Sequence, residues 1–501
     1  MSAGVSALWN LAVEFEIGVA TEMTEHRNIS MQKPLFVDLD GCLVRSDTLF
    51  ECLVQMIKGA PWLLLWLPLW LLQGGKALLK KNIADRTTLD VSILPFTPQV
   101  LALIKTARAQ GRRVILATAT HEKLAHKVAD HLGCFDDVIA TTDEQNLRGR
   151  SKLSAIQAYL GGSGEFAYIG NDSSDQAIWQ SSSEALIVNG NHRLTEKVKR
   201  QGGTSLGEHQ GWIRPLLKGL RPQQWVKNFL LFVPLFFAHQ YMDLNSIFSA
   251  LLGFIAFSFC ASGTYLLNDM FDIENDRKHP EKHKRPFAAA TLPLQVGIAA
   301  SGGFILAGLI IGLLLPLKFL ILLVGYLVIT CAYSFRLKRV IMMDVVVLAG
   351  LYTIRIIAGA EAIDVPLSFW LLAFSMFLFL SLALVKRFSE VSKLHAKGGE
   401  TVNGRGYVVD DRWVVSQLGT ASGLISVMIM ALYVNSHNVV QLYSNPRLIW
   451  LLCPLFMYWI GRIWLLATRG EIDEDPVVFA ARDRRTWLVG AACVSIVLLA
   501  V

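Results

Sequence analysis

Three aspartates in one short stretch have the residue type and the spacing to bind a metal-bound phosphate. Asp269, Asp272 and Asp276 follow an apolar run, residues 246–267, that is long enough to cross a bilayer. At positions i, i+3 and i+7 they would share one face of a continuing helix. Three ionised carboxylates that close repel one another unless a cation lies among them. Such hard oxygen ligands suit Mg²⁺ carrying a di- or triphosphate, although a solvated, charged loop is the alternative.

Basic residues follow these acids. Lys282 and Arg285 come next along the chain and would clamp the far side of such a phosphate.

The ordered pattern Asn268-Asp269-x-x-Asp272-x-x-x-Asp276 resembles the first aspartate motif of the UbiA superfamily of intramembrane prenyltransferases. Its extension, residues 279–286, resembles one branch, the decaprenyl-phosphate phosphoribosyltransferases. The resemblance runs from about residue 221 to the end of the chain and implies a substrate site with further members. These are Arg221, Lys227, Asn228, Tyr333, Lys338 and Asp344.

The loop around residues 333–344 has few acids. Aromatic prenyltransferases of the superfamily carry a second acidic cluster there, whereas this chain has only Asp344 beside Lys338 and other basic residues. The exchange suits an anionic second substrate such as a lipid monophosphate. Arg355 lies inside the next apolar span, where its charge is costly unless it lines a polar site. Lys386 and Arg387 resemble a further motif of the same branch, or anchor the chain to lipid headgroups.

A second pair of acids ends a short apolar strand near the N-terminus. Asp38 and Asp40 flank one residue, so both would meet a ligand at the carboxyl end of a parallel sheet. The pattern resembles the haloacid-dehalogenase-like phosphatases, and the later motifs of that family follow in order along the chain. They place Thr118 and Lys152 on phosphate, and Asn171, Asp172 and Asp175 with Asp38 and Asp40 at a Mg²⁺ site.

The resemblance implies a chemistry that the residue types can support. Asp38 would attack phosphorus and form an aspartyl-phosphate, and Asp40 would protonate the leaving alcohol and then activate water. Asn171 replaces an acid of the family pattern and removes one negative charge, which Asp172 would replace at altered geometry. A degenerate regulatory domain is therefore the alternative to an active phosphatase.

An apolar segment interrupts the phosphatase motifs at residues 61–72. Trp62, Trp66 and Trp70 recur at a helical spacing and would form one aromatic face, flanked by lysines. The segment is too short to cross the hydrocarbon core. We expect a cap that enters the membrane interface, and a buried cap helix is the alternative.

Composition supports a membrane protein with a soluble portion. Hydrophobic residues make up 53% of the 501 residues and charged residues 17%, and the net charge is +7. The basic excess lies mostly in loops between apolar spans, so it indicates how the chain is oriented in the membrane and suits anionic substrates. We expect no nucleic acid partner. The seven cysteines include no Cys-x-x-Cys pair, so we expect reduced thiols.

The expected organisation is a two-domain chain. Its first part is an α/β, Rossmann-like, haloacid-dehalogenase-type domain with a helical cap. An all-α, polytopic membrane domain of about nine transmembrane helices follows. The boundaries are a poorly ordered lead-in (1–30), the phosphatase domain (31–205), a linker with an interfacial helix (206–227) and the membrane domain (228–501).

The loops between the nine expected spans are alternately basic and nearly uncharged. By the positive-inside rule, the phosphatase domain and the motif loops face the cytoplasm of an inner-membrane protein. The expected spans are 228–240, 246–268, 293–315, 317–334, 342–361, 366–385, 413–434, 447–467 and 486–501.

These expectations combine into one reaction. A 5-phosphoribosyl group moves from phosphoribosyl pyrophosphate to polyprenyl phosphate with Mg²⁺, and the fused phosphatase removes the 5-phosphate. Transfer of a prenyl group from prenyl diphosphate to an aromatic or alcohol acceptor is the alternative in the same fold. A transporter or membrane anchor is disfavoured, because the acids cluster at one surface. Oligomeric state is not predicted.

Overall fold

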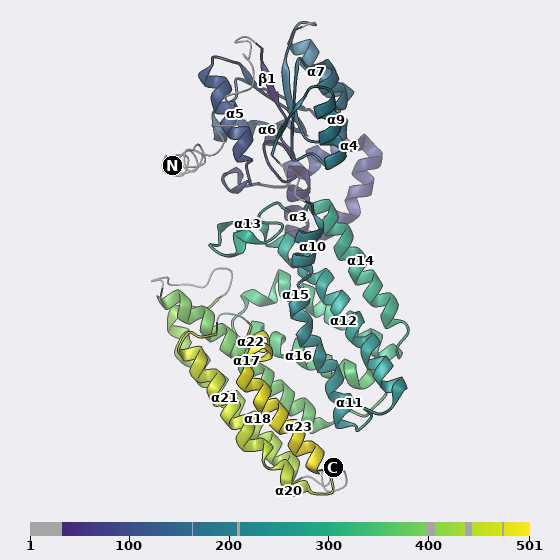
Figure 1. Cartoon of the computed structure of the whole chain (residues 1–501), viewed down its shortest axis with the longest axis vertical. Coiled ribbons are helices and arrows are strands. Elements are labelled where there is room, and N and C mark those ends of the chain that lie inside the picture. The colour runs from purple at the N-terminus through teal and green to yellow at the C-terminus, as the bar shows by residue number, and fades with distance from the viewer. Residues whose placement is uncertain are drawn as a thin grey trace. The chain divides into compact units, whose positions relative to one another are not determined.

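The computed structural model describes residues 33–162, 164–207, 211–396, 406–435, 443–472 and 475–500. The expected lead-in, residues 1–30, lies outside this part of the chain. The fold divides into two compact units (Figure 1). Unit 1 joins residues 1–219 to residues 269–298, and unit 2 joins residues 220–268 to residues 299–501. Each unit is described by itself.

Unit 1 is built on a parallel sheet of six strands in the order β3-β2-β1-β4-β5-β6. Alternate side chains of β1 enter different cores, because successive residues of a strand point to opposite faces. Leu35 and Val37 pack with helices α5 and α6, while Phe36 packs with α7, α8 and α9. The strands are β1 (Leu35–Val37), β2 (Val114–His121), β3 (Asp137–Thr141), β4 (Ala167–Gly170), β5 (Glu184–Val188) and β6 (Thr204–Leu206).

Helices cover both faces of this sheet, and the segment around the aspartates adds two short helices to the same unit. They are α3 (Thr48–Gly59), η1 (Pro61–Trp66), α4 (Leu67–Asp85), η2 (Val91–Ile93), α5 (Pro98–Ala109), α6 (Glu122–Leu132), α7 (Arg150–Tyr159), η3 (Ser173–Asp175), α8 (Gln176–Ser181), α9 (His192–Arg200), α13 (Ile273–Lys278) and η5 (Lys282–Lys284).

The apolar cap segment differs from its expected form. Trp62 and Trp66 are exposed, whereas Trp70 is buried under the guanidinium of Arg86, so the three tryptophans do not share one face. The reason is a change from the 3₁₀-helix η1 to the α-helix α4, which alters the angular spacing of side chains. The helix also breaks at Gly74 and Gly75. Although η1 and α4 together are apolar enough for a membrane span, Lys80 of α4 donates to the carbonyl of Ala119 on strand β2 of unit 1.

Unit 2 is helical, and three helices, α10, α12 and α14, have residues in both units. Among the described residues, eight segments are long and apolar enough to cross a membrane, and all except 61–85 lie between Leu244 and Thr468. The helices are α10 (Ile213–Leu220), η4 (Pro222–Phe232), α11 (Val233–Phe237), α12 (Leu244–Phe271), α14 (Leu294–Gly312), α15 (Leu317–Phe335), η6 (Leu337–Arg339), α16 (Met343–Ala362), α17 (Phe369–Ala396), η7 (Val409–Asp411), α18 (Arg412–Val434), α20 (Pro446–Ile449), α21 (Leu452–Thr468), α22 (Pro476–Arg482) and α23 (Arg484–Ala500).

The fold class is confirmed in both parts, with differences at two element borders. The expected first span, 228–240, is not one α-helix but the 3₁₀-helix η4 followed by the short α11. Pro234 has no amide hydrogen, so it cannot close an α-helical bond across this junction. The expected linker helix ends at Leu220, because Arg221 adopts a left-handed backbone conformation.

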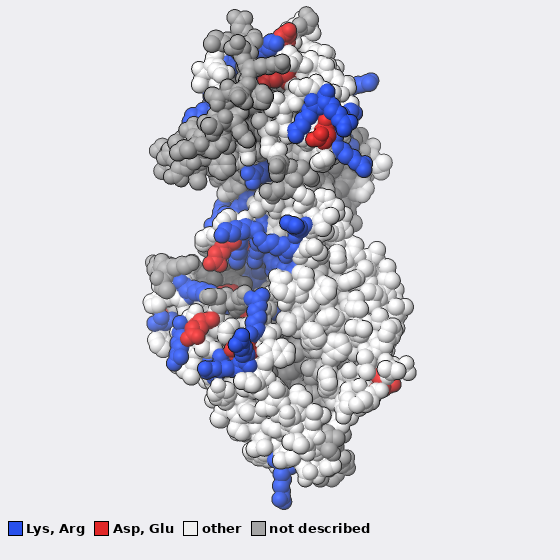
Figure 2. Space-filling model, in the orientation of Figure 1, with Lys and Arg blue, Asp and Glu red and all other residues white. Residues whose placement is uncertain are grey.

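Surface charge is uneven on the face shown in Figure 2. A broad surface over α11, α12 and α14 carries almost no charged side chains, as expected for helices that face lipid. Most charged residues that this view shows in the lower part of the molecule lie to the left of that surface, with one acidic side chain at its right edge.

Candidate functional sites

The phosphatase motif residues gather at the carboxyl ends of the central strands of unit 1. Asp38 directly follows β1, and Thr118 lies on the neighbouring strand β2, where it is completely buried. Asp38 donates its backbone amide to the carbonyl of Ile169 on β4, 3.0 Å away. Parallel pairing therefore brings three motifs from distant parts of the chain to one edge of the sheet.

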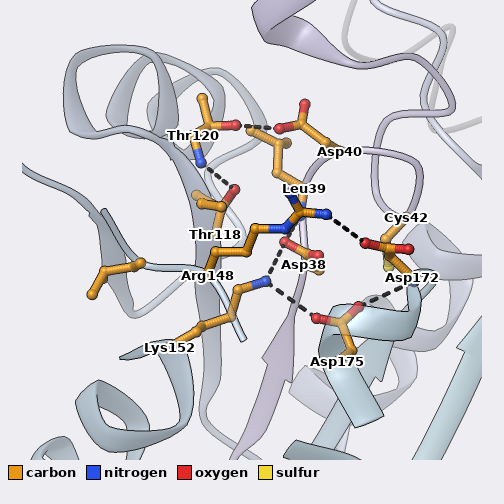
Figure 3. A network of polar contacts seen from close by, with 12 residues as sticks. Asp38, Leu39, Asp40, Cys42, Thr118, Thr120, Arg148, Lys152, Asp172 and Asp175 are labelled. Carbon is orange, nitrogen blue, oxygen red and sulfur yellow. Dashed lines mark hydrogen bonds and ion pairs between the residues drawn. The ribbon is translucent and has the colours of Figure 1, made fainter. Parts of the chain in front are cut away.

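One lysine shares two carboxylates at this edge (Figure 3). Lys152, from the first turn of α7, lies 3.0 Å from Asp38 Oδ1 and 3.5 Å from Asp175 Oδ1. The Tyr168 hydroxyl accepts from Lys152 and donates to Asp175, at 2.9 Å in each case. Lys152 is only 2% exposed and Asp175 1%. The cluster therefore buries two carboxylates against one ammonium group.

Burial sets the electrostatics of the nucleophile candidate. Loss of solvation raises the pKa of Asp38 to about 7, although Lys152 lowers it. For Lys152, burial opposes the charged form, but Asp38 and Asp175 together raise its pKa above the usual value. Lys152 is therefore stabilised in its charged form, because two carboxylates surround this single ammonium group.

Asp40 is held apart from the lysine by hydroxyl groups. Its Oδ1 accepts from both the backbone amide and the hydroxyl of Thr48, at 2.7 Å each, and its Oδ2 accepts from the Thr120 hydroxyl. Thr120 in turn donates its amide to the Thr118 hydroxyl, 3.0 Å away (Figure 3). This arrangement fixes the carboxylate that would carry the proton to a leaving group.

The residues of the fourth motif differ in what their side chains contact, although Asn171 and Asp172 both line the cavity at this edge of the sheet. Asn171 lies against the turn after β1, because a Cβ added at Gly41 would come 2.0 Å from its Nδ2. Asp175 Oδ2 accepts from the backbone amides of Asn171 and Asp172. Asp172 caps its own turn and pairs with Arg148 at 3.1 Å, so its carboxylate is engaged outside the place of the missing acid (Figure 3).

A cavity of about 1030 Å³ opens at this edge of the sheet. Asp38, Asp40, Lys152 and Asn171 line it, together with Lys80 of the cap and residues 290–295 of the same unit. The cavity is large enough for a sugar phosphate with part of a lipid chain.

The donors suit Mg²⁺ in kind, although in the described part of the chain no three acidic, histidine or cysteine side chains are grouped closely enough to hold a metal alone. The raised pKa of Asp38 is the relevant test, because a divalent cation would supply the positive charge that this carboxylate needs to remain ionised. Asp38, Asp40 and Asn171 are the residues that would hold it.

The aspartate segment of unit 1 also pairs two carboxylates with one cation. Arg285 Nη1 lies 3.2 Å from Asp269 Oδ1 and 2.8 Å from Asp276 Oδ2. Both aspartates are buried, and burial raises the pKa of Asp276 even though Arg285 opposes the shift. Asp272, in contrast, lies 3.7 Å from Lys58. The expected single face of three aspartates is therefore divided.

The division has a backbone cause. The helix α12 ends at Phe271 and α13 begins at Ile273, with Asp272 between them outside the helical conformation. Asn268 lies half-buried in the last turns of α12, and Lys282 is exposed on η5. Arg285, expected on phosphate, instead supplies the positive charge between Asp269 and Asp276.

Within unit 2, the hydrogen bonds of Arg355 connect its helix, α16, to η4 and to α15. Its Nε donates to Asn228 Oδ1 at 2.8 Å, and its Nη2 donates to the Tyr326 hydroxyl at 3.2 Å. Asn228 also donates to Ser258 Oγ at 3.0 Å. Both predicted residues are buried and in contact, which joins α16 to η4.

Lys227 and Lys386 also come together, around a carboxylate that sequence reasoning missed. Asp475, at the N-cap of α22, lies 2.7 Å from Lys227 Nζ and 3.2 Å from Lys386 Nζ. The Tyr352 hydroxyl donates to the same carboxylate at 3.1 Å. The sequence signal that could have found it is an acid-rich stretch, residues 471–475, within a loop that was interpreted only through its basic residues.

Asp344 and Arg387 form a separate pair that is completely buried. Arg387 Nη2 lies 2.6 Å from Asp344 Oδ2, and the Tyr407 hydroxyl donates to Asp344 Oδ1 at 2.7 Å. Arg387 also pairs with Glu390. This arrangement favours a structural role over the substrate contact expected for both residues.

The remaining predicted residues of the membrane domain stay less defined. Arg221 lies over the ring of Tyr265 at 5.5 Å, and Tyr333 and Lys338 are half-buried near the end of α15 and on η6. Their roles at the site remain predictions.

Comparison with known proteins finds two family models on the chain. The UbiA prenyltransferase family matches residues 229–489, and the haloacid dehalogenase-like hydrolase matches residues 35–178. An uncharacterized protein, y4nM, of Sinorhizobium fredii is 36% identical over 474 residues, covering 93% of this chain and 91% of that protein.

Two kinds of shorter relative match part of the chain. The nodulation protein NoeC of Azorhizobium caulinodans is 34% identical over 266 residues, covering 52% of this chain and 85% of that protein. A decaprenyl-phosphate phosphoribosyltransferase of Mycolicibacterium smegmatis is 33% identical over 209 residues, covering 40% of this chain and 65% of that protein. A solved structure of a UbiA homolog from Archaeoglobus fulgidus, bound to GPP and Mg²⁺, covers 57% of this chain and 100% of that chain at 17% identity, with a TM-score of 0.45.

Proposed function

Because this chain belongs to the UbiA prenyltransferase family and carries a haloacid dehalogenase-like domain, we propose a two-step enzyme that builds a lipid-linked ribose. The membrane domain transfers a 5-phosphoribosyl group from phosphoribosyl pyrophosphate to polyprenyl phosphate. The phosphatase domain then removes the 5-phosphate. The decaprenyl-phosphate phosphoribosyltransferases among the relatives support this choice of substrates.

The observation that carries the proposal is the charge of the partly buried lysine cluster in unit 2. Lys227 and Lys386 share the single carboxylate of Asp475, while Asp344 is engaged by Arg387. A second metal-bound diphosphate would need free carboxylates there, whereas an anionic acceptor needs cations. This balance favours a phosphate-bearing acceptor over a neutral aromatic one.

In the transfer step, the bond between ribose C1 and the pyrophosphate oxygen breaks, and a bond from C1 to the lipid phosphate oxygen forms. Mg²⁺ bound by Asp269, Asp272 and Asp276 would neutralise charge on the leaving pyrophosphate. Arg285 would exchange its carboxylate partners for phosphate oxygens. The other predicted phosphate contacts are Lys227, Lys282 and Lys338. The nucleophile is already an anion, so positioning and electrostatics supply most of the catalysis.

In the hydrolytic step, Asp38 attacks the 5-phosphate while Asp40 protonates the ribose 5-oxygen. Thr118 and Lys152 bind phosphate oxygens, and Asp40 then takes a proton from the water that opens the aspartyl-phosphate. The exposed Trp62 and Trp66 would bring the cap to the membrane interface, which raises the effective concentration of a lipid-borne substrate.

Membranes containing the full chain test the proposal directly. They are incubated with phosphoribosyl pyrophosphate labelled with ¹⁴C in the ribose, with and without added polyprenyl phosphate, and the lipids are extracted. We expect label in the lipid fraction only with the acceptor present. If the label never enters lipid while a labelled prenyl diphosphate alkylates a small aromatic acceptor, the enzyme is a conventional prenyltransferase instead.

A further inference from the structure

Four elements of unit 2 meet at the Asp475 carboxylate. Lys227 comes from η4, Tyr352 from α16, Lys386 from α17, and Asp475 itself from the N-cap of α22. The lysine side chains are 12% and 31% exposed and that of Asp475 is 10% exposed. Such a meeting of distant segments is held by the carboxylate, because it is the one group in contact with all the others.

The cluster carries more positive than negative charge. Among the described residues, two ammonium groups oppose the carboxylate of Asp475, and Arg355 lies close by, with its guanidinium 5.8 Å from the centre of the Tyr352 ring. Lys227 Nζ lies 5.4 Å from the same ring. A purely structural ion pair would need only one lysine, and holding a second ammonium group in the same partly buried place costs free energy unless an anion binds it.

The carboxylate itself cannot serve as a base. Burial alone would raise the pKa of Asp475, but Lys227 and Lys386 outweigh burial and hold that pKa well below its usual range. Each lysine has three N–H donors, and its bond to Asp475 uses only one of them. The cluster therefore has hydrogen-bond donors to offer an incoming anion.

The surroundings identify the kind of anion. The ring of Tyr352 stacks on Phe379 with the centres 5.0 Å apart, and both belong to a large apolar core that also contains Phe388 and Trp464. A free sugar phosphate would gain little from such a neighbourhood. A phosphate attached to a hydrocarbon chain would place its charge on the lysines and its apolar part along the helices.

We infer that Asp475 is a positioning residue that holds Lys227 and Lys386 as a two-lysine site for the phosphate of polyprenyl phosphate. The inference deepens the proposed function and rests on it for the identity of the acceptor. Asp475 acts through the lysines, and so it does not touch the reacting atoms.

Three variants of the purified full chain test the role of Asp475 in transfer. Asp475→Asn should raise the KM for polyprenyl phosphate about tenfold or more, with a smaller change in kcat and no change in the KM for phosphoribosyl pyrophosphate. Asp475→Glu should restore the KM to within about threefold, because it keeps the charge. An unchanged or lowered KM in Asp475→Asn would overturn the positioning role.

Asp483→Asn is the matched control for loss of an ion pair. Asp483 follows α22 and pairs with Arg462 at 2.6 Å, apart from the lysine cluster. We expect a lower melting temperature in this variant and an unchanged KM for polyprenyl phosphate. If Asp483→Asn raises that KM as much as Asp475→Asn does, the effect reflects general weakening of the segment and the inference fails.

A binding assay separates failure of the inference from failure of the proposed function. Farnesyl phosphate should raise the melting temperature of the wild-type chain by several degrees, and farnesol should not. Asp475→Asn should lose most of that shift. If the shift depends on Asp475 but no phosphoribosyl transfer occurs, only the proposed reaction is wrong. If transfer occurs but the shift does not depend on Asp475, only the inference is wrong.

Discussion

Unit 1 and unit 2 each gather lysine and aspartate side chains, but in opposite proportions. In unit 1, Lys152 serves the two carboxylates of Asp38 and Asp175. In unit 2, the single carboxylate of Asp475 serves Lys227 and Lys386. Each cluster is therefore incomplete in charge, and the missing charge identifies the ligand class. An acid-rich cluster accepts a divalent cation, whereas a lysine-rich cluster accepts a phosphate.

The aspartate segment belongs with the acid-rich class. Asp269 and Asp276 share the guanidinium of Arg285, although a diphosphate donor is itself an anion. A divalent cation resolves this conflict, because it can bind carboxylate and phosphate oxygens together. In the proposed function, the two acid-rich clusters would be cation sites and the lysine cluster would bind the phosphate of the acceptor.

The largest effect should come from removing an acid-rich cluster's metal ligand. Asp269→Asn should reduce label transfer to lipid by about a hundredfold or more, because it removes a charged ligand with little change in volume. Asp243→Asn is the matched control, since Asp243 accepts bonds from Ser246 in the first turn of the same helix, α12. That variant should lose a little stability and keep its activity. Comparable losses in both variants would remove the basis for a metal site.

Removing the ammonium group of Lys152, which two carboxylates of unit 1 share, should lower the stability of the fold as well as the activity. Lys152→Met would leave two buried carboxylates without their ammonium partner, which typically costs about 3–5 kcal/mol. Lys81→Met, which removes a lysine from a solvent-exposed pair with Asp143, should cost much less. Chemical denaturation in detergent measures both. Equal costs would show that charge proportion in the buried cluster has little energetic weight.

A smaller effect should follow from adding an acid to the acid-rich cluster. Asn171→Asp restores the carboxylate of the family pattern beside the turn at Gly41. The Mg²⁺ concentration for half-maximal phosphatase activity should then fall about three- to tenfold, because ligand charge governs affinity for hard cations. Asp172→Asn should leave that concentration unchanged, since Asp172 pairs with Arg148. An unchanged requirement in Asn171→Asp would place position 171 outside the metal site.

Sequence reasoning was most informative where neighbouring strands position the site. The end of β1 and its pairing with β2 and β4 predict that Asp38, Thr118 and the motif around Asn171 meet at one edge of the sheet. The family membership of both domains was also predictable from ordered motifs and is confirmed. The lysine-rich cluster was harder to predict, because Lys227 and Asp475 are 248 residues apart and no local pattern connects them.

Local breaks explain the other differences. A continuous helix through Asp269, Asp272 and Asp276 was a fair expectation from their spacing, but Asp272 leaves the helical conformation. Trp70 separates from Trp62 and Trp66 because η1 is a 3₁₀-helix. Asp344 and Arg387 are charged residues of the kind expected at a substrate site, yet they pair with each other in the core of the unit. Spacing alone cannot reveal such pairing.

A double-label measurement tests the coupling of the two sites most directly. Membranes receive polyprenyl phosphate and phosphoribosyl pyrophosphate carrying ¹⁴C in the ribose and ³²P in the 5-phosphate. Wild-type lipid should contain ¹⁴C with almost no ³²P. In Asp38→Asn, whose amide cannot attack phosphorus, the two labels should appear in equal molar amounts, while Asp172→Asn should match wild type. Equal labels in both wild type and Asp38→Asn, or ¹⁴C without ³²P in both, would contradict the account.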